Sequence, residues 1–256
     1  MPGAIDRAEL VELVQSVPFW YHSIDLGEGV VTPGRKPPSA IAEHLDALRL
    51  PPLEGKTFLD IGAWDGYFSF EAERRGASRV VALDHFVWSL ELQPQGVPLE
   101  TPDAWQPERL PGKRGFDLAH RALGSGVEDR VGDFMTMDLA ELGSFDVVLF
   151  SGVLYHLESP FEAIRRLARV TREVAAIETE AICVPALEQH ALCEFFGGAE
   201  LHGDPSNWWA PNMKALQEMC RAAGFQRVNV VLGPPNPHEF DHLAVNRYRA
   251  IVHALK

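Results

Sequence analysis

The sequence predicts an α/β fold with a doubly wound, mainly parallel seven-stranded sheet and an N-terminal helical and aromatic extension. Three observations predict it. Short apolar runs alternate with helix-like segments along most of the chain. A glycine turn follows the first apolar run, and an acid ends the second. The 256 residues, 46% of them hydrophobic, are enough for one large core.

The first 40 residues predict an extension outside the sheet. Asp6 and Glu9 can cap a short amphipathic helix, which should end before Pro18. The stretch "PFWYHSIDLGEGVVTPGRKPP" is rich in Gly and Pro, yet it carries three adjacent aromatic side chains followed by a histidine. We interpret residues 1–40 as a lid and residues 41–256 as the domain that carries the sheet.

Helices and strands should alternate from residue 41 onward, and Gly76 and Gly224 lie where helix C-terminal caps belong. Strands are expected near residues 57–62, 79–84, 127–133, 145–151, 173–179, 225–232 and 246–254. Two long interruptions, residues 86–112 and 185–211, are rich in proline and aromatic residues. Long loops inside a compact domain are usually functional, so we expect both to recognise substrate.

Charge and composition limit the kinds of partner and metal that this protein is expected to bind. The 23 basic and 36 acidic residues give a net charge of −13, which repels polyphosphate and makes a nucleic-acid partner less favourable. No leader-like or membrane-length apolar segment is visible, so a cytoplasmic location is expected. Cys183, Cys193 and Cys220 lack metal-ligand spacing. His238 and His242 flank two acids, but the nearby prolines favour a solvated loop, so no metal is expected.

The glycine turn indicates the kind of ligand. A dinucleotide fold needs G-x-G-x-x-G, because the pyrophosphate binds backbone amides at a helix N-terminus. Residues 62–66 read Gly-Ala-Trp-Asp-Gly, so Trp64 occupies the position of the central glycine. Asp60 and Asp65 add negative charge beside the turn. This arrangement favours a cationic ligand, such as a sulfonium nucleoside that also carries an ammonium group.

Four motifs, "LDIGAWDG", "VVALD", "GDFMTMD" and "FDVVLFSGVLYHLESP", occur in an order and spacing that resemble the class I S-adenosylmethionine (SAM) methyltransferases. The resemblance covers roughly residues 40–256 and implies a Rossmann-like methyltransferase fold with SAM as cofactor. It departs from many relatives at Trp64, where they have glycine. A nicotinamide oxidoreductase is disfavoured by the same missing glycine.

The resemblance also implies a set of cofactor-binding residues. Asp60, Gly62 and Gly66 would surround the methionine part of SAM, Asp84 would accept from the ribose hydroxyls, and Asp133 would accept from the adenine amino group. The full set that the resemblance implies is Asp60, Gly62, Ala63, Trp64, Gly66, Asp84, His85, Asp133, Phe134 and Ser151. As an alternative, Asp60 and Asp84 could be strand-end caps.

A closer resemblance is to the family that carboxymethylates the wobble uridine of tRNA, carried by "FDVVLFSGVLYHLESPFEAI", "SNWWAPNMKALQEMCRAAGF" and the terminal "RYRAIVHALK". In that family a tyrosine, an arginine and a lysine hold the extra carboxylate of carboxy-SAM. Tyr155 and Arg249 match the first two. Ser16 stands where the lysine is expected, which favours plain SAM.

Methyl transfer from a sulfonium is an in-line displacement that needs no metal. His156, which follows the fourth strand, has a suitable intrinsic pKa to take a proton from a hydroxyl acceptor, or it could only hydrogen-bond the backbone. Tyr155 fits a pocket wall better than a base. One of the adjacent residues Trp208 and Trp209 should cap the acceptor while the other enters the core, although a structural role for both is an equal alternative. The predicted acceptor-binding residues are Tyr21, His22, Asn207, Trp208, Trp209, Asn212 and Arg249.

The leading hypothesis is therefore a SAM-dependent methyltransferase that O-methylates a small molecule, such as a sugar or another secondary metabolite. Modification of the tRNA wobble uridine by methyl or carboxymethyl transfer is the second hypothesis. A noncatalytic SAM-binding protein is the third, and the aromatic insertions speak against it. The acceptor and the oligomeric state do not follow from the sequence.

Overall fold

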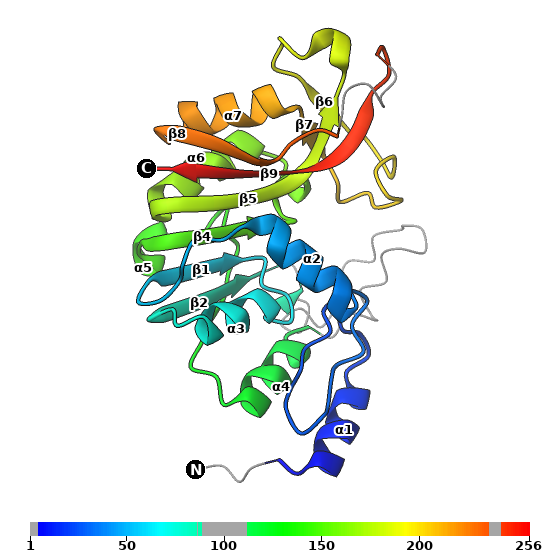
Figure 1. The fold of residues 1–256 in the computed structure, drawn as a ribbon, viewed down its shortest axis with the longest axis vertical. Helices are drawn as coiled ribbons and strands as arrows, with labels where there is room; N and C mark the ends of the chain where they lie inside the picture. The colour runs from blue at the N-terminus through cyan, green and yellow to red at the C-terminus, as the bar shows by residue number, and fades with distance from the viewer. Residues whose placement is uncertain (1–4, 86, 89–111, 236–241) are drawn as a thin grey trace. The chain divides into compact units, whose positions relative to one another are not determined.

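The computed structural model describes residues 5–85, 87–88, 112–235 and 242–256 (Figure 1). The elements, in chain order, are α1 (Arg7–Ser16), α2 (Pro38–Leu48), β1 (Thr57–Ile61), α3 (Tyr67–Arg74), β2 (Arg79–Asp84), α4 (Arg114–Leu123), β3 (Glu128–Val131), α5 (Leu139–Leu142), β4 (Phe145–Ser151), η3 (Leu154–His156), α6 (Pro160–Val170), β5 (Thr171–Cys183), η4 (Pro185–Leu187), β6 (Cys193–Phe195), β7 (Trp209–Pro211), α7 (Met213–Ala222), β8 (Arg227–Leu232) and β9 (Asn246–Leu255).

A seven-stranded sheet has the order β3-β2-β1-β4-β5-β9-β8. The pairs β1–β2, β2–β3 and β4–β5 are parallel, whereas β9 is antiparallel to both β5 and β8. The predicted mainly parallel sheet with flanking helices is confirmed. All seven predicted strands are present, and only β5 departs from its predicted ends by more than two residues.

The chain divides into two compact units, the first of which comprises residues 1–46 and 52–134. Its strands β1 and β2 are almost wholly buried, as expected for parallel strands covered on both faces. Helix α3 packs on both strands, and α1 packs against α4. The predicted cap of α1 is present, because the N–H of Glu9 donates to Asp6 Oδ1 over 2.9 Å.

The second unit comprises residues 47–51 and 135–256. Helix α6 packs on β4 and β5 and also contacts α7. Strands β5 and β9 lie side by side along most of their length (Figure 1). Strand β5 runs on to Cys183, past the predicted end at residue 179, and Glu180 on this extension lies directly opposite Arg249 of β9. The opposite charge of Arg249 allows Glu180 to be buried within this strand.

The predicted insertion at residues 185–211 contains a short antiparallel ribbon, β6–β7, that the sequence did not predict. Phe196, Leu201 and Ala210 pack with Ile182 at the end of β5 and form a small apolar cluster of their own. The insertion therefore has a defined structure. Most of the other predicted insertion, residues 86–112, lies outside the described residues; Val87 and Trp88 within it are buried.

Two absences concern the described residues alone. None of their helices is both long enough and apolar enough to cross a membrane. No group of three or more His, Cys, Asp or Glu side chains among them could hold a metal ion. His242 is exposed, and its predicted neighbour His238 lies outside the described residues.

Candidate functional site

The glycine turn that joins β1 to α3 requires its glycines. Gly62 and Gly66 have φ values of 81° and 86°, in the left-handed region that other residues rarely adopt. A Cβ on Gly66 would lie 2.7 Å from atoms of the Phe70 and Phe116 rings. The N–H of Gly62 donates to Leu83 O, which fixes the turn beside the end of β2.

Trp64, which stands where many proteins of the resembled class have glycine, adopts the left-handed conformation, with φ at 52°. Two hydrogen bonds hold it there. Its N–H donates to Asp84 Oδ2 over 2.9 Å, and the indole N–H of Trp88 donates to its carbonyl over 2.6 Å. The ring of Tyr21 lies 5.0 Å from the Trp64 ring. The departure from glycine is thus accommodated by neighbouring side chains.

Asp84 ends β2 with a carboxylate that is 4% exposed. Besides the Trp64 N–H, it accepts the N–H of Val87 at Oδ1 over 3.1 Å. Burial raises the pKa of Asp84, although these backbone donors oppose the shift. The residue thus organises the turn, as the strand-cap alternative proposed, and its role as acceptor from the ribose hydroxyls stays a prediction.

Asp60 lies within β1 and is 3% exposed. Its Oδ2 accepts a 2.7 Å hydrogen bond from Ser69 Oγ on α3. Burial raises the pKa of Asp60 to about 7, and the charges of Asp84 and Asp65 add to this rise. A cationic partner would stabilise this carboxyl strongly, because a nearby positive charge restores its ionised form.

Asp65 adds negative charge beside the turn, as predicted, since its charge contributes to the raised pKa of Asp60, and its oxygens also bond the N-terminal segment. Its Oδ1 lies 2.5 Å from His22 Nδ1, and its Oδ2 accepts the N–H groups of Tyr21 and His22 over 2.9 and 2.7 Å. His22 is 4% exposed. The predicted lid residues are therefore tied to the glycine turn, and the His22 imidazole is enclosed beside Tyr67 and Phe68.

The other predicted cofactor residues of the first unit differ in burial. Ala63 is buried, and its N–H donates to Leu83 O over 3.2 Å. His85 is exposed directly after β2. Asp133 is half-buried in the segment that follows β3, and Phe134 beside it is buried. Their predicted contacts with the adenine and ribose stay predictions.

In the second unit, Ser151 at the end of β4 belongs to a buried charged group. Its Oγ donates to Glu178 Oε2 over 2.9 Å. Arg249 Nε lies 2.5 Å from Glu178 Oε1, and another of its nitrogens lies 2.7 Å from Glu180 Oε1. Glu178 and Glu180 are each only 4% exposed. One guanidinium therefore serves two buried carboxylates.

Arg249 also lies over the ring of Tyr155, 5.0 Å from its centroid. Burial alone would lower the pKa of Arg249, but the carboxylate of Glu178 raises it above its ordinary value. The sequence resemblance assigned Tyr155 and Arg249 to one group, and the structure places these two side chains in contact. Glu178 and Glu180 were not predicted, although two acids at i and i+2 in the apolar run "AAIETEAIC" must share one face of a strand.

His156 ends the short helix η3 that follows β4. Its Nδ1 lies 3.0 Å from Ser206 Oγ and 3.2 Å from Ser206 O. Ser206 Oγ in turn donates to Asp204 Oδ1 over 2.6 Å. Burial lowers the pKa of His156. The imidazole is therefore neutral near pH 7, which is the form that can accept a proton.

Trp208 and Trp209 are both partly exposed, so the prediction that one of them enters the core is wrong. Both indoles lie against Phe195, which the sequence had not singled out, at centroid distances of 6.3 and 4.8 Å. Phe195 is itself 55% exposed. The ribbon β6–β7 places it opposite Trp209, and the three rings form an aromatic surface.

The two predicted asparagines have different surroundings. Asn212 caps α7: its Oδ1 accepts the N–H groups of Ala215 and Leu192, and its Nδ2 donates to His190 O over 2.7 Å. These bonds use its amide, so it is a structural residue and not the acceptor contact we predicted. Asn207 is 2% exposed and donates to Leu201 O, while its Oδ1 is buried without a partner among the described residues.

A known protein family matches most of this sequence. The family model for the methyltransferase domain matches residues 35–230. The chain belongs to the methyltransferase domain family. This match confirms the predicted resemblance to SAM-dependent methyltransferases, the enzyme class and the cofactor, since the family uses SAM.

Curated relatives of this methyltransferase carry a more specific name. The tRNA U34 carboxymethyltransferase of Pseudomonas putida (strain W619) is 30% identical over 195 residues, which are 75% of this chain and 51% of that protein. The protein of the same name from Idiomarina loihiensis (strain ATCC BAA-735 / DSM 15497 / L2-TR) is 29% identical over 234 residues, 88% of this chain and 62% of that protein. The chain thus spans about half to three fifths of the length of these relatives.

A solved structure shares the fold across nearly the whole methyltransferase chain. The N-terminal domain of EvdMO1, crystallised in the presence of S-adenosylhomocysteine (SAH) and D-fucose, has a TM-score of 0.63 and 19% sequence identity. The comparison covers 98% of this chain and 97% of that one. This similarity supports the fold assignment.

Buried polar atoms near the turn fit a bound cofactor. His22 Nε2 and Trp64 Nε1 are buried and lack a hydrogen-bond partner among the described residues. Such atoms are rare in folded proteins unless a ligand or water completes them. The indole N–H of Trp64 can only donate and fits an acceptor atom of a polar ligand, whereas the raised pKa of Asp60 agrees with a cationic group at this turn.

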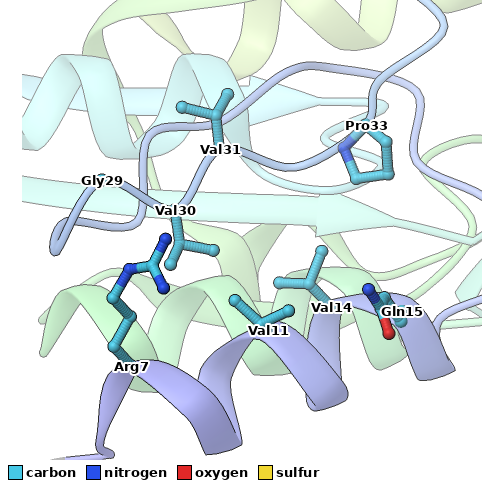
Figure 2. Close-up of a pocket in the computed structure, with 8 residues that line it drawn as sticks. All are labelled: Arg7, Val11, Val14, Gln15, Gly29, Val30, Val31 and Pro33. Carbon is cyan, nitrogen blue, oxygen red and sulfur yellow. The ribbon is translucent and has the colours of Figure 1, made fainter.

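A separate cavity of about 340 Å³ lies between α1 and the loop at residues 29–33 (Figure 2). Its wall is mostly aliphatic, with Val11, Val14 and Val30 among the lining residues, and Arg7 lines it as well. It contains none of the predicted site residues.

Proposed function

We propose that this methyltransferase transfers a methyl group from SAM to a hydroxyl of a small-molecule acceptor, such as a sugar or another secondary metabolite. The observation that carries the proposal is the environment of His156. A neutral, half-buried imidazole in the segment that follows β4 is suited to remove the proton of a hydroxyl acceptor, a step that an ordinary hydroxyl requires to attack a sulfonium methyl.

The residues have distinct tasks in the proposed reaction. When bound, SAM supplies an electrophilic methyl group. The glycine turn with Asp60 and Asp84 holds the methionine and ribose ends of the cofactor. His156 receives the hydroxyl proton of the acceptor. The aromatic surface of Phe195, Trp208 and Trp209 offers the acceptor apolar contact and helps to exclude water.

A second candidate is modification of the tRNA wobble uridine, which the name of the curated relatives favours. Three observations weigh against it. Ser16 replaces the lysine expected to help bind the extra carboxylate of carboxy-SAM, and Arg249 already faces Glu178 and Glu180. The net charge of −13 further opposes binding to a polyanion.

Turnover assays test the choice between the two. Purified protein is incubated with methyl-labelled SAM and either D-fucose, D-glucose or bulk tRNA, and the products are identified by mass spectrometry. We expect methylated sugar, with loss of turnover in the Trp208→Ala and Trp209→Ala variants. A Phe161→Ala variant is a suitable control, because Phe161 is an exposed aromatic residue on α6.

Salt dependence provides an independent measurement. Binding to tRNA releases counterions, so its affinity falls with salt by a slope of roughly −0.7 to −0.9 per phosphate contacted. A neutral sugar should react at a rate that hardly changes with salt. Tight, salt-sensitive tRNA binding with methyl or carboxymethyl transfer to a wobble uridine would replace the proposal with the second candidate.

A further inference from the structure

We propose that Asp204 and Ser206 are positioning residues that hold His156 in the tautomer protonated at Nδ1, so that Nε2 carries the lone pair that accepts the proton. The proposal rests on the function proposed above. The three side chains come from η3 and from the insertion at residues 185–211, and they form a chain of hydrogen bonds within one compact unit.

The number of hydrogen atoms on each group determines which atom donates in this series of hydrogen bonds. Ser206 Oγ has a single hydrogen, and the 2.6 Å contact with the carboxylate of Asp204 uses it. Ser206 Oγ then has only lone pairs left for His156 Nδ1, 3.0 Å away. A second oxygen near Nδ1, the carbonyl of Ser206, is also only an acceptor. His156 Nδ1 must therefore carry the hydrogen that it shares with both oxygens.

The backbone supports the same arrangement. The N–H of Ser206 donates to Asp204 Oδ1 over 2.8 Å, so Asp204 fixes both the main chain and the hydroxyl of Ser206. The next peptide segment is anchored to η3, because the N–H of Trp208 donates to Tyr155 O over 2.7 Å. The insertion thus holds Ser206 against the imidazole from two sides.

Proton transfer to His156 in the proposed reaction gives its imidazole a positive charge. The acceptor oxygen bonds to the methyl carbon while the carbon–sulfur bond breaks, its electron pair goes to sulfur, and the hydroxyl proton goes to His156 Nε2. The resulting imidazolium is stabilised by the charges of Asp204 and Glu180 and destabilised by that of Arg249. Asp204 acts through Ser206 and also through its charge.

Nitrogen NMR of the imidazole tests the tautomer without any turnover. Long-range ¹H–¹⁵N correlation spectra of the full chain, with His156→Asn to assign the signal, should show Nδ1–H and an unprotonated Nε2 at pH 8. Titration of Asp204→Asn should give a His156 pKa lower than in the wild type by roughly one unit, because a nearby negative charge is lost. A Glu200→Gln variant, which removes an exposed carboxylate from the same insertion, should leave that pKa unchanged.

Kinetics give the second measurement. In Asp204→Asn and in Ser206→Ala we expect kcat to fall about tenfold or more, with KM nearly constant. The pH–rate midpoint of Asp204→Asn should move down together with the NMR pKa, which a merely structural role would not cause. An Nε2–H signal in the wild type, or an unchanged His156 pKa in Asp204→Asn, overturns the inference. A fully active His156→Asn overturns the proposed role of His156 as base, whatever tautomer NMR reports.

Discussion

His22 Nδ1 lies 2.5 Å from Asp65 Oδ1, so a buried side-chain pair ties the N-terminal segment to the glycine turn. The other carboxylate oxygen of Asp65 accepts two backbone N–H groups of that segment, from Tyr21 and His22. The first residues after α1 are therefore part of the structure around the turn. This relationship leads to the first prediction.

Replacing Asp65 with Ala should destabilise the protein by roughly 3–5 kcal/mol, because three buried polar groups lose their common partner. The affinity for SAH should fall as well, since Trp64 and Gly66 adjoin Asp65 in the turn. Urea unfolding and calorimetric titration measure the two effects. Glu12→Gln, a change of an exposed carboxylate on α1, should change neither. Equal stability of Asp65→Ala and wild type would show that the pair does not hold the segment.

Cofactor binding should depend on pH through Asp60. The pKa of its carboxyl is raised to about 7 in the ligand-free protein, whereas the cationic cofactor requires the ionised form. Binding of SAH, which keeps the ammonium group, should therefore release a proton near pH 7 and strengthen between pH 6 and pH 8. Calorimetry in two buffers with different ionisation enthalpies counts the protons. Asp60→Asn should bind weakly and with no such pH dependence.

The same pKa has a consequence for stability. The folded state keeps Asp60 protonated up to about pH 7, whereas the unfolded chain ionises it near its ordinary pKa of 3.8. The free energy of unfolding therefore falls as pH rises between these two values. Replacing Asp60 with Asn, which can still accept from Ser69 Oγ, should remove that loss. Ligand-free Asp60→Asn should thus unfold at a higher temperature than wild type at pH 8, with a smaller difference at pH 4.

Asp84→Ala should reduce the affinity for SAH at least tenfold, because hydrogen bonds to a charged acceptor are worth roughly 1.5–3 kcal/mol each. The ligand-free variant should also have a lower melting temperature than the wild type, since Asp84 accepts the N–H groups of Trp64 and Val87. Asp46→Asn, an exposed change on α2, is the control, and unchanged SAH binding in Asp84→Ala would contradict its role.

Plain SAM should bind at least as well as carboxy-SAM, because Arg249 already pairs with two carboxylates, those of Glu178 and Glu180. Competition titrations with the two cofactors measure this preference directly. Arg249→Met should also lower the free energy of unfolding by about 3–5 kcal/mol, since two buried carboxylates lose the guanidinium that they share. Arg247→Met, which breaks a pair with Glu194 nearer the surface, should cost about 1 kcal/mol or less. A clear preference for carboxy-SAM that Arg249→Met abolishes would restore the wobble-uridine function.

Local patterns in the sequence determined the sheet and the turn. Apolar runs of strand length predicted strands such as β1, β2 and β4, because a buried parallel strand needs apolar side chains on both faces. Gly62 and Gly66 were identified for the same local reason, a backbone conformation with positive φ. The pairing of Asp6 with the N–H of Glu9 also depends on residues three apart. Such features involve only near neighbours, so they can be predicted from the sequence alone.

Only the tertiary structure decided which polar side chains meet. Glu178 and Arg249 are 71 residues apart, and His156 and Ser206 are 50 apart. The sequence marked His156 and Arg249 as candidates but could not reveal the partners that set their charge and hydrogen bonding. It also assigned Asn212 to the acceptor, where the fold uses it to cap α7. Partner choice depends on strand register and on the path of the insertion, and both follow from packing of the whole unit rather than from any local pattern.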